Sequence, residues 1–203
     1  IKIMLNQTSF LIFLLFLFAF AQKVLALPDC GDQFFTHCHG TINHKNGEKY
    51  VGEIKNYKYE GFGTYLFVNG NVYEGEFKNG IQNGNGIFKF SNGDKYEGEF
   101  KNGLFHGKGV GTTSNGNKYS GIYKDDLPHG YGTQILVNGD KYEGEFKFGL
   151  RSGYGTLYLA NGDKYEGNFE NDLYNGEGIL KKKNGVTMQG QFKNQEFLEN
   201  LNN

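Results

Sequence analysis

The sequence has 203 residues, a formal net charge of −1, and 32 Gly against only 2 Pro, together with 19 Phe and 14 Tyr. The balanced charge argues against a nucleic-acid-binding protein, which usually carries a strongly basic domain or stripe. So much Gly without Pro excludes collagen, and the many aromatic rings exclude a featureless linker. Gly and aromatic residues in this abundance indicate short strands joined by tight turns.

The N-terminal segment has the pattern of a secretory leader. Lys2 precedes an uninterrupted apolar run over residues 10–21, which is shorter than the roughly 20 residues that span a bilayer. Ala21 closes a small-x-small cleavage pattern, and Ala26 is a second candidate cleavage position. We therefore expect residues 1–26 to be a cleaved signal peptide, which places the mature protein in the secretory pathway or outside the cell. An uncleaved membrane anchor is the alternative.

The only two cysteines, Cys30 and Cys38, lie directly after this leader. An even number of cysteines behind a signal peptide favours a disulfide. Free thiols and a metal site with nearby histidines are alternatives, although the cysteine spacing does not match the usual zinc-ligand pairs. We expect residues 27–49 to form an N-terminal cap that contains half a repeat.

A strict 23-residue period governs the rest of the chain, and each unit contains a Tyr-x-Gly segment, a Gly-x-Gly pair and a turn sequence. Six full units occupy residues 50–187, and residues 188–203 begin a seventh as a degenerate C-terminal cap. Atypical terminal units are the expected caps of a stacked array. The period is marked by Tyr50, Tyr73, Tyr96, Tyr119, Tyr142 and Tyr165.

Each unit has the pattern of two strands. Tyr73, Gly75 and Phe77 share one face of the first strand, and the two Glu between them share the other. An Asn-Gly pair then marks a turn before the second strand at residues 86–90. The pattern predicts at least 12 strands within residues 50–187 and no long helix.

A single hairpin is marginally stable in water, so the units are expected to stack on one another. The predicted fold is all-β, an elongated, twisted, single-layer antiparallel sheet of stacked hairpin repeats. Gly is expected where it leaves room for a ring from the next strand. The predicted structural ladder in the best-kept units comprises Tyr73, Gly75, Phe77, Tyr96, Gly98, Phe100, Tyr142, Gly144 and Phe146.

Residues 73–80, followed by Gly84-x-Gly86, resemble the membrane occupation and recognition nexus (MORN) repeat, and six such matches in register cover residues of about 40–192. The resemblance implies an elongated, curved and twisted antiparallel sheet. It also implies a role in membrane attachment, phospholipid binding or self-assembly. MORN arrays occur in junctional membrane proteins, in cytoskeletal and ciliary scaffolds, in phosphatidylinositol phosphate kinases and beside the SET domain of a histone methyltransferase.

Two features depart from the family pattern. The fourth unit has Ser120 and Ile122 where the other well-kept units have Glu. Known arrays mainly face the cytosol, and the leader ahead of this array points to another compartment.

No motif for catalysis, cofactor binding or metal binding is apparent. The pair Glu74 and Glu76 recurs along the array, which indicates a solvated strand face and not a glycosidase site. The Gly-rich residues 98–109 lack a phosphate-loop sequence, and the Asn-Gly-Asp turns are explained by turn geometry without calcium. The sequence therefore predicts a non-enzymatic binding or scaffold protein without a cofactor. The alternative is a targeting subunit or fragment related to MORN-containing phosphatidylinositol phosphate kinases, without its own kinase domain.

The expected partners are proteins, with self-association and weak contact with anionic phospholipid as further expectations, and no nucleic acid. The largest basic cluster is the candidate lipid contact, and it comprises Lys181, Lys182 and Lys183. Elsewhere Lys78, Lys101 and Lys147 are each preceded within four residues by a Glu pair, which is expected to offset their charge.

We predict that mass spectrometry of the native protein will find no residue before Ala21 or Ala26. Detection of Leu14 or Phe16 in the mature protein would contradict this prediction and identify the segment as a membrane anchor.

Overall fold

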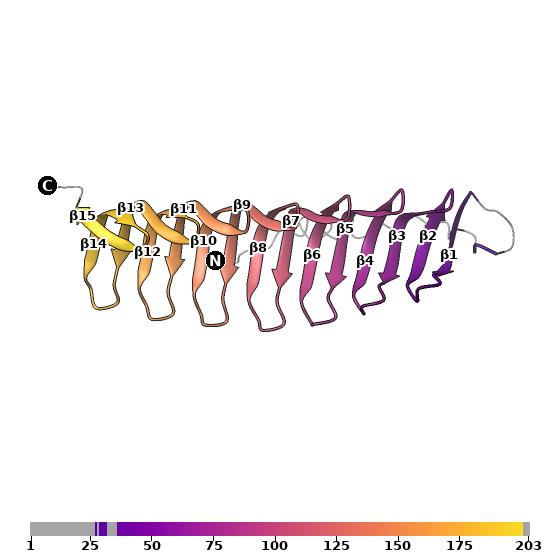
Figure 1. Ribbon diagram of the computed structural model, residues 1–203, viewed down its shortest axis with the longest axis horizontal. Coiled ribbons are helices and arrows are strands. Elements are labelled where there is room, and N and C mark those ends of the chain that lie inside the picture. Colours follow the sequence, from indigo (N-terminus) through magenta and orange to yellow (C-terminus); the bar gives the residue numbers. More distant parts are fainter. Residues whose placement is uncertain (1–26, 28, 32–35, 201–203) are drawn as a thin grey trace, which may run out of the picture.

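The computed structural model describes residues 27, 29–31 and 36–200, so the predicted leader at residues 1–26 lies outside the described residues. One antiparallel sheet of 15 strands, arranged in chain order, accounts for all the named elements (Figure 1). No helix in this described part is long and apolar enough to cross a membrane. The predicted elongated single-layer sheet of stacked hairpins is confirmed. Its strands are β1 (His37–Asn43), β2 (Lys49–Lys55), β3 (Lys58–Leu66), β4 (Val72–Lys78), β5 (Ile81–Lys89), β6 (Lys95–Lys101), β7 (Leu104–Thr112), β8 (Lys118–Lys124), β9 (Leu127–Ile135), β10 (Lys141–Lys147), β11 (Leu150–Tyr158), β12 (Lys164–Glu170), β13 (Leu173–Lys181), β14 (Thr187–Lys193) and β15 (Glu196–Asn200).

Within each repeat, a two-residue turn joins a shorter strand to a longer one. Asn79 and Gly80 both have positive φ, 54° and 89°, which is the geometry of the type I′ turn that suits a twisted hairpin. The longer strand β5 therefore starts at Ile81, well before the predicted start at residue 86. The prediction placed this start too late because Gly84 interrupts the alternation with a bulge opposite β4.

The longer turns between repeats are linked to one another by side chains. Asp94 Oδ1 accepts a hydrogen bond from the backbone N–H of Ser114, in the next such turn, at 2.7 Å. The Asn-Gly-Asp sequence thus holds neighbouring turns in register. Equivalent bonds join Asn71 to Ser91, Asn117 to Val137, Asp140 to Ala160 and Asp163 to Lys183.

The rings of the predicted ladder are buried, and they contact rings of the adjacent repeats. Tyr73 is 0% exposed and Phe100 is 3% exposed, and their ring centroids lie 4.8 Å apart in an edge-on contact between successive repeats. Such edge-on pairs stabilise a fold beyond the area that they bury. The same contact joins Tyr50 to Phe77, Tyr96 to Tyr123, Tyr119 to Phe146, Tyr142 to Phe169 and Tyr165 to Phe192.

The glycines make room for a tyrosine ring that lies over a cross-strand pair of them. A Cβ added to Gly75 would lie 2.6 Å from the Tyr73 hydroxyl oxygen and 2.5 Å from the Cα of Gly86, and a Cβ at Gly86 would meet the same ring at 2.6 Å. The Tyr73 hydroxyl donates to the carbonyl oxygen of Glu76 at 2.8 Å, so the ring stays over the glycine pair. The ring therefore comes from the adjacent strand at Gly86, but from its own strand at Gly75, where the expectation of a ring from the next strand is wrong. Burial raises the pKa of Tyr165 to about 12, so this tyrosine stays neutral at physiological pH.

We predict that Phe100→Ala lowers the free energy of unfolding by about 3–5 kcal/mol, because it removes a buried ring that contacts the rings of Tyr73, Tyr96 and Phe105. Phe148, at 67% exposure in a two-residue turn, provides the control, and Phe148→Ala should change stability by less than about 0.5 kcal/mol. Urea denaturation measures both. Equal losses in the two variants would show that the ladder is not the core.

Candidate binding groove

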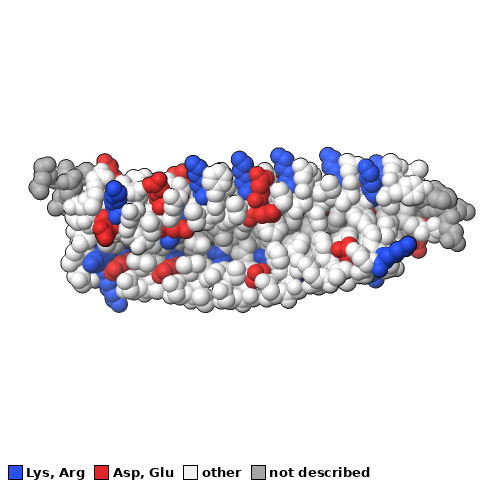
Figure 2. Space-filling model, in the orientation of Figure 1, with Lys and Arg blue, Asp and Glu red and all other residues white. Residues whose placement is uncertain are grey.

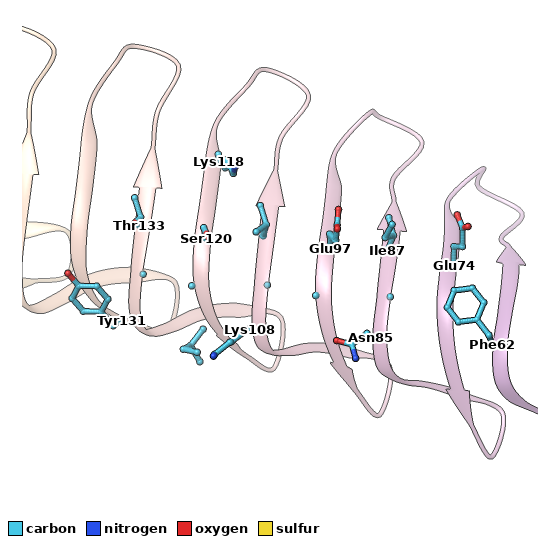
Figure 3. Close-up of a pocket in the computed structure, with 17 residues that line it drawn as sticks. Phe62, Glu74, Asn85, Ile87, Glu97, Lys108, Lys118, Ser120, Tyr131 and Thr133 are labelled. Carbon is cyan, nitrogen blue, oxygen red and sulfur yellow. The ribbon is translucent and has the colours of Figure 1, made fainter. Parts of the chain in front are cut away.

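The side of the sheet opposite the tyrosine ladder, here termed the open face, carries a shallow groove. The groove has a volume of about 1000 Å³ and extends from β3 to β9. Figure 3 shows two rows of side chains along it, one near the middle of the strands and one near the bulges. The side chains that line it are Phe62, Glu74, Asn85, Ile87, Glu97, Lys108, Val110, Lys118, Ser120, Ile122, Tyr131 and Thr133.

A bulge in each hairpin sets the row that contains Phe62, Asn85, Lys108 and Tyr131, the middle residues of the Gly-x-Gly pairs. In β7, Gly107 has φ +57°, and the next residue donates its backbone N–H to Glu99 Oε1 at 2.9 Å. Equivalent bonds use Glu53, Glu76 and Glu145. The second glutamate of each pair therefore satisfies the backbone amide that the bulge removes from the ladder of sheet hydrogen bonds.

Aromatic side chains stand at both ends of the groove. Phe62 is 57% exposed and Tyr131 is 65% exposed, and Figure 3 shows them at opposite ends with Asn85 and Lys108 between them. Tyr154, 54% exposed, continues the row beyond the groove. Exposed aromatic rings are among the side chains that are enriched in protein interfaces.

Most charged side chains in the row near the middle of the strands form ion pairs. Lys95 Nζ lies 2.6 Å from a Glu97 carboxylate oxygen, and this lysine holds the pKa of that carboxyl below its usual value. Lys141 and Glu143, like Lys164 and Glu166, repeat the pair at 2.7 Å. The pairs are solvent-exposed, so they contribute little to stability.

The candidate residues from the sequence lie in three separate places. Cys30 and Cys38 form a disulfide at the N-terminal edge, where the backbone N–H of Cys30 donates to the carbonyl oxygen of His39. The tyrosine ladder forms the core on the other side of the sheet from the groove. The exposed lysines from Lys181 to Lys183 lie at the end of β13 and in the following turn.

Sequence reasoning missed the groove and the role of the glutamate pairs. Glu74 and Glu76 were assigned alike to a solvated face, yet Glu74 pairs with Lys89 whereas Glu76 caps the bulge. The bulge glycines have positive φ, which alternation alone does not reveal. The residue between the two glycines of each Gly-x-Gly pair varies, and it is aromatic in three repeats. This variation is the sequence signal that indicates the groove.

Comparison with protein-family models finds six consecutive MORN repeats, at residues 50–72, 73–95, 96–118, 119–141, 142–164 and 165–187. The chain belongs to the MORN-repeat family. The predicted number of MORN repeats and the predicted 23-residue period are confirmed. No curated protein matches the chain as a relative.

Two of the solved structures that match this MORN array show distant likeness to it. The TCP domain of SAS-4 (dCPAP) from Drosophila melanogaster, in complex with a Proline Rich Motif of Ana2 (dSTIL), is 14% identical. The match covers 75% of this chain and 89% of that chain, with a TM-score of 0.41. A catalytically inactive virginiamycin B lyase from Staphylococcus aureus is 15% identical over 76% of this chain and 55% of that chain, with a TM-score of 0.19. At these TM-scores neither likeness bears on what this chain does.

We predict that the bulge contact makes Gly107→Ala more destabilising than Gly130→Ala. Both glycines have left-handed φ, 57° and 61°, so both substitutions carry a backbone cost of about 1–2 kcal/mol. A Cβ at Gly107 would also lie 2.4 Å from the Glu99 carboxylate, whereas at Gly130 the nearest atom, on Ile122, is 3.7 Å away. Urea denaturation should show the larger loss for Gly107→Ala, partly relieved by adding Glu99→Ala. Equal losses for the two glycines would contradict the contact.

Proposed function

We propose that this MORN array is a non-enzymatic scaffold that binds a linear segment of a protein partner in the groove of its open face. The length of the groove is the observation that supports this proposal. Six strand spacings separate β3 from β9, which amounts to roughly 29 Å. That length matches a helix of about 19 residues or a shorter extended segment, so the shape favours a polypeptide over a small molecule.

The composition of the groove supports protein binding. Ile87, Val110 and Ile122 are partly buried apolar side chains on its floor, and exposed rings stand at its ends. Protein interfaces combine an apolar centre, aromatic anchors and a polar rim. The MORN family is associated with scaffolds, which is consistent with this proposal.

A scaffold role accounts for the carboxylates without catalysis. The second glutamates bind backbone amides, and the first glutamates pair with lysines, so both sets have structural partners. No cluster of three metal-ligating side chains occurs among the residues that the structure describes. The alternative of a targeting subunit related to phosphatidylinositol phosphate kinases would use the same groove, with a catalytic protein as the partner.

We predict that the protein selects peptides from a display library of random linear segments of about 20 residues. Phe62→Ala with Tyr131→Ala should weaken binding of the selected peptides at least tenfold, because it removes both aromatic anchors. Phe148→Ala removes an equally exposed ring outside the groove and should leave binding unchanged. Selected peptides that bind the groove variant as well as the native protein would refute the groove as the site.

Anionic lipid is a second candidate ligand, favoured by a row of lysines along one edge of the sheet. Six shorter strands end in lysine at the two-residue turns, and basic side chains stand at intervals along the upper edge in Figure 2. Between them Ile81, Leu104, Leu127 and Leu150 are 39–46% exposed. The lysines of this basic edge are Lys55, Lys78, Lys101, Lys124, Lys147 and Lys193.

Neighbouring glutamates offset the positive charge of this edge less than the sequence indicated. Glu76 and Glu99 are held at the bulges, and the lysines that end the same strands, Lys78 and Lys101, have no ion pair among the described residues. Each lysine near an anionic bilayer contributes about 1 kcal/mol. The triplet at residues 181–183 lies at the opposite edge, on a longer turn, so the two contacts can be tested separately.

We predict weak, salt-sensitive sedimentation of residues 27–203 with anionic vesicles. Two variants that each remove three charges locate the contact: Lys78, Lys101 and Lys124→Ala, and Lys181, Lys182 and Lys183→Ala. The variant that weakens sedimentation identifies the contacting edge. Tight binding that survives both variants and physiological salt would show that the sheet face recognises lipid directly.

We also infer a secretory or extracellular location, with membrane anchoring through the leader as the alternative. The leader pattern at residues 1–26 and the Cys30–Cys38 disulfide support it, because disulfides persist in oxidising compartments. Self-association is a remaining possibility for the array, tested by its sedimentation velocity at increasing concentration.

A further inference from the structure

The fourth repeat lacks both groove carboxylates. Its strand β8 carries Ser120 and Ile122 where β6 and β10 carry glutamates. Both residues line the groove, and Figure 3 shows Ser120 toward the end marked by Tyr131. The change removes two negative charges from one place on an otherwise regular surface.

Because Ser120 replaces the first glutamate, Lys118 lacks the carboxylate with which the equivalent lysines pair. In the third, fifth and sixth repeats a lysine two residues before the glutamate pairs with it at 2.6–2.7 Å. Lys118 occupies the same position, but Ser120 follows it. Its exposed ammonium group has no ion pair within residues 36–200.

The second loss affects Lys108 on β7. Its direct cross-strand neighbour is Ile122, whereas the equivalent residues Asn85 and Tyr131 face Glu99 and Glu145. Glu99 accepts a hydrogen bond from the backbone N–H of Lys108 but makes no ion pair with its ammonium group. Two exposed, unpaired ammonium groups therefore stand on either side of the apolar Ile122 and Val110.

We propose that the groove over β7 and β8, next to Tyr131, selects an acidic segment of the protein partner, with Asp or Glu side chains placed against Lys108 and Lys118. Apolar or aromatic residues of the segment lie on both sides, against Phe62 and Tyr131. This inference rests on the proposed function of the groove. Complementary charge fixes the register of a bound segment, and a mismatched charge there is costly.

A peptide fits these observations better than a bilayer does. The two lysines line a groove, Lys108 in the row near the bulges and Lys118 toward the longer turns, whereas a flat lipid surface contacts raised edges first. The elongated shape also exceeds what a single phosphate group occupies. Acidic peptide binding requires Lys108 and Lys118, whereas lipid binding requires the lysines of the basic edge. One set of variants therefore separates the two.

The test uses the full chain and the same display library of linear peptides. Peptides selected by the native protein should be enriched in Asp and Glu toward the end that contacts Tyr131. Lys108→Ala with Lys118→Ala should weaken the binding of those peptides at least tenfold. The loss should be smaller at high salt, where the charges are screened. Lys101→Ala with Lys124→Ala removes the same charge from the basic edge and is the matched control, with less than a twofold effect expected.

A second variant restores the acids that the other repeats have. Ser120→Glu with Ile122→Glu should pair with both lysines and abolish the acidic preference, while peptides held by the aromatic anchors still bind. Thermal unfolding checks that each variant is folded.

The outcomes separate the two proposals. If no peptide is selected at all, the groove function fails and this inference fails with it. If peptides are selected without acidic residues, or if the Lys108 and Lys118 variant binds them normally, the inference alone is overturned. It is also overturned if that variant loses binding to anionic vesicles and not to peptides, which would assign the two lysines to lipid headgroups.

Discussion

A tyrosine ring held over a cross-strand pair of glycines is the contact on which the array depends. A side chain at Gly75 or Gly86 would occupy the space of the Tyr73 ring, and the Tyr73 hydroxyl is fixed by the carbonyl of its own strand. The aromatic residue four positions after each tyrosine then meets the ring of the preceding repeat. This arrangement lets one layer of strands bury a core without a second layer to cover it.

Because the core uses one face only, the other face is free to vary. The glutamate at the bulge has a structural partner, but its neighbour inside Gly-x-Gly does not enter the core. That position holds Phe62, Asn85, Lys108 and Tyr131 in successive repeats. Constant residues thus build the sheet, and the variable ones differentiate its surface, as is usual where repeats present an extended binding face.

The sequence predicted the fold because its evidence is local and repeated. Period-two alternation around Tyr73 and turn residues such as Asn79-Gly80 each specify structure within a few residues, and the six copies agree. The groove could not be predicted in this way. Its middle row depends on the positive φ of glycines such as Gly84, and the roles of Glu74 and Glu76 differ only through cross-strand partners.

The charge of the groove shows why departures from a repeat can carry more information than its consensus. In the sequence, Ser120 and Ile122 are a departure of the fourth unit from the repeat pattern. Their strand nevertheless keeps the core, since Tyr119 and Tyr123 are buried at 7% and 6% exposure. Substitutions that spare every core position and alter only groove positions change the surface without changing the fold. Loss of two carboxylates beside two lysines is a local change in binding chemistry, placed by the register of the sheet near the Tyr131 end of the groove.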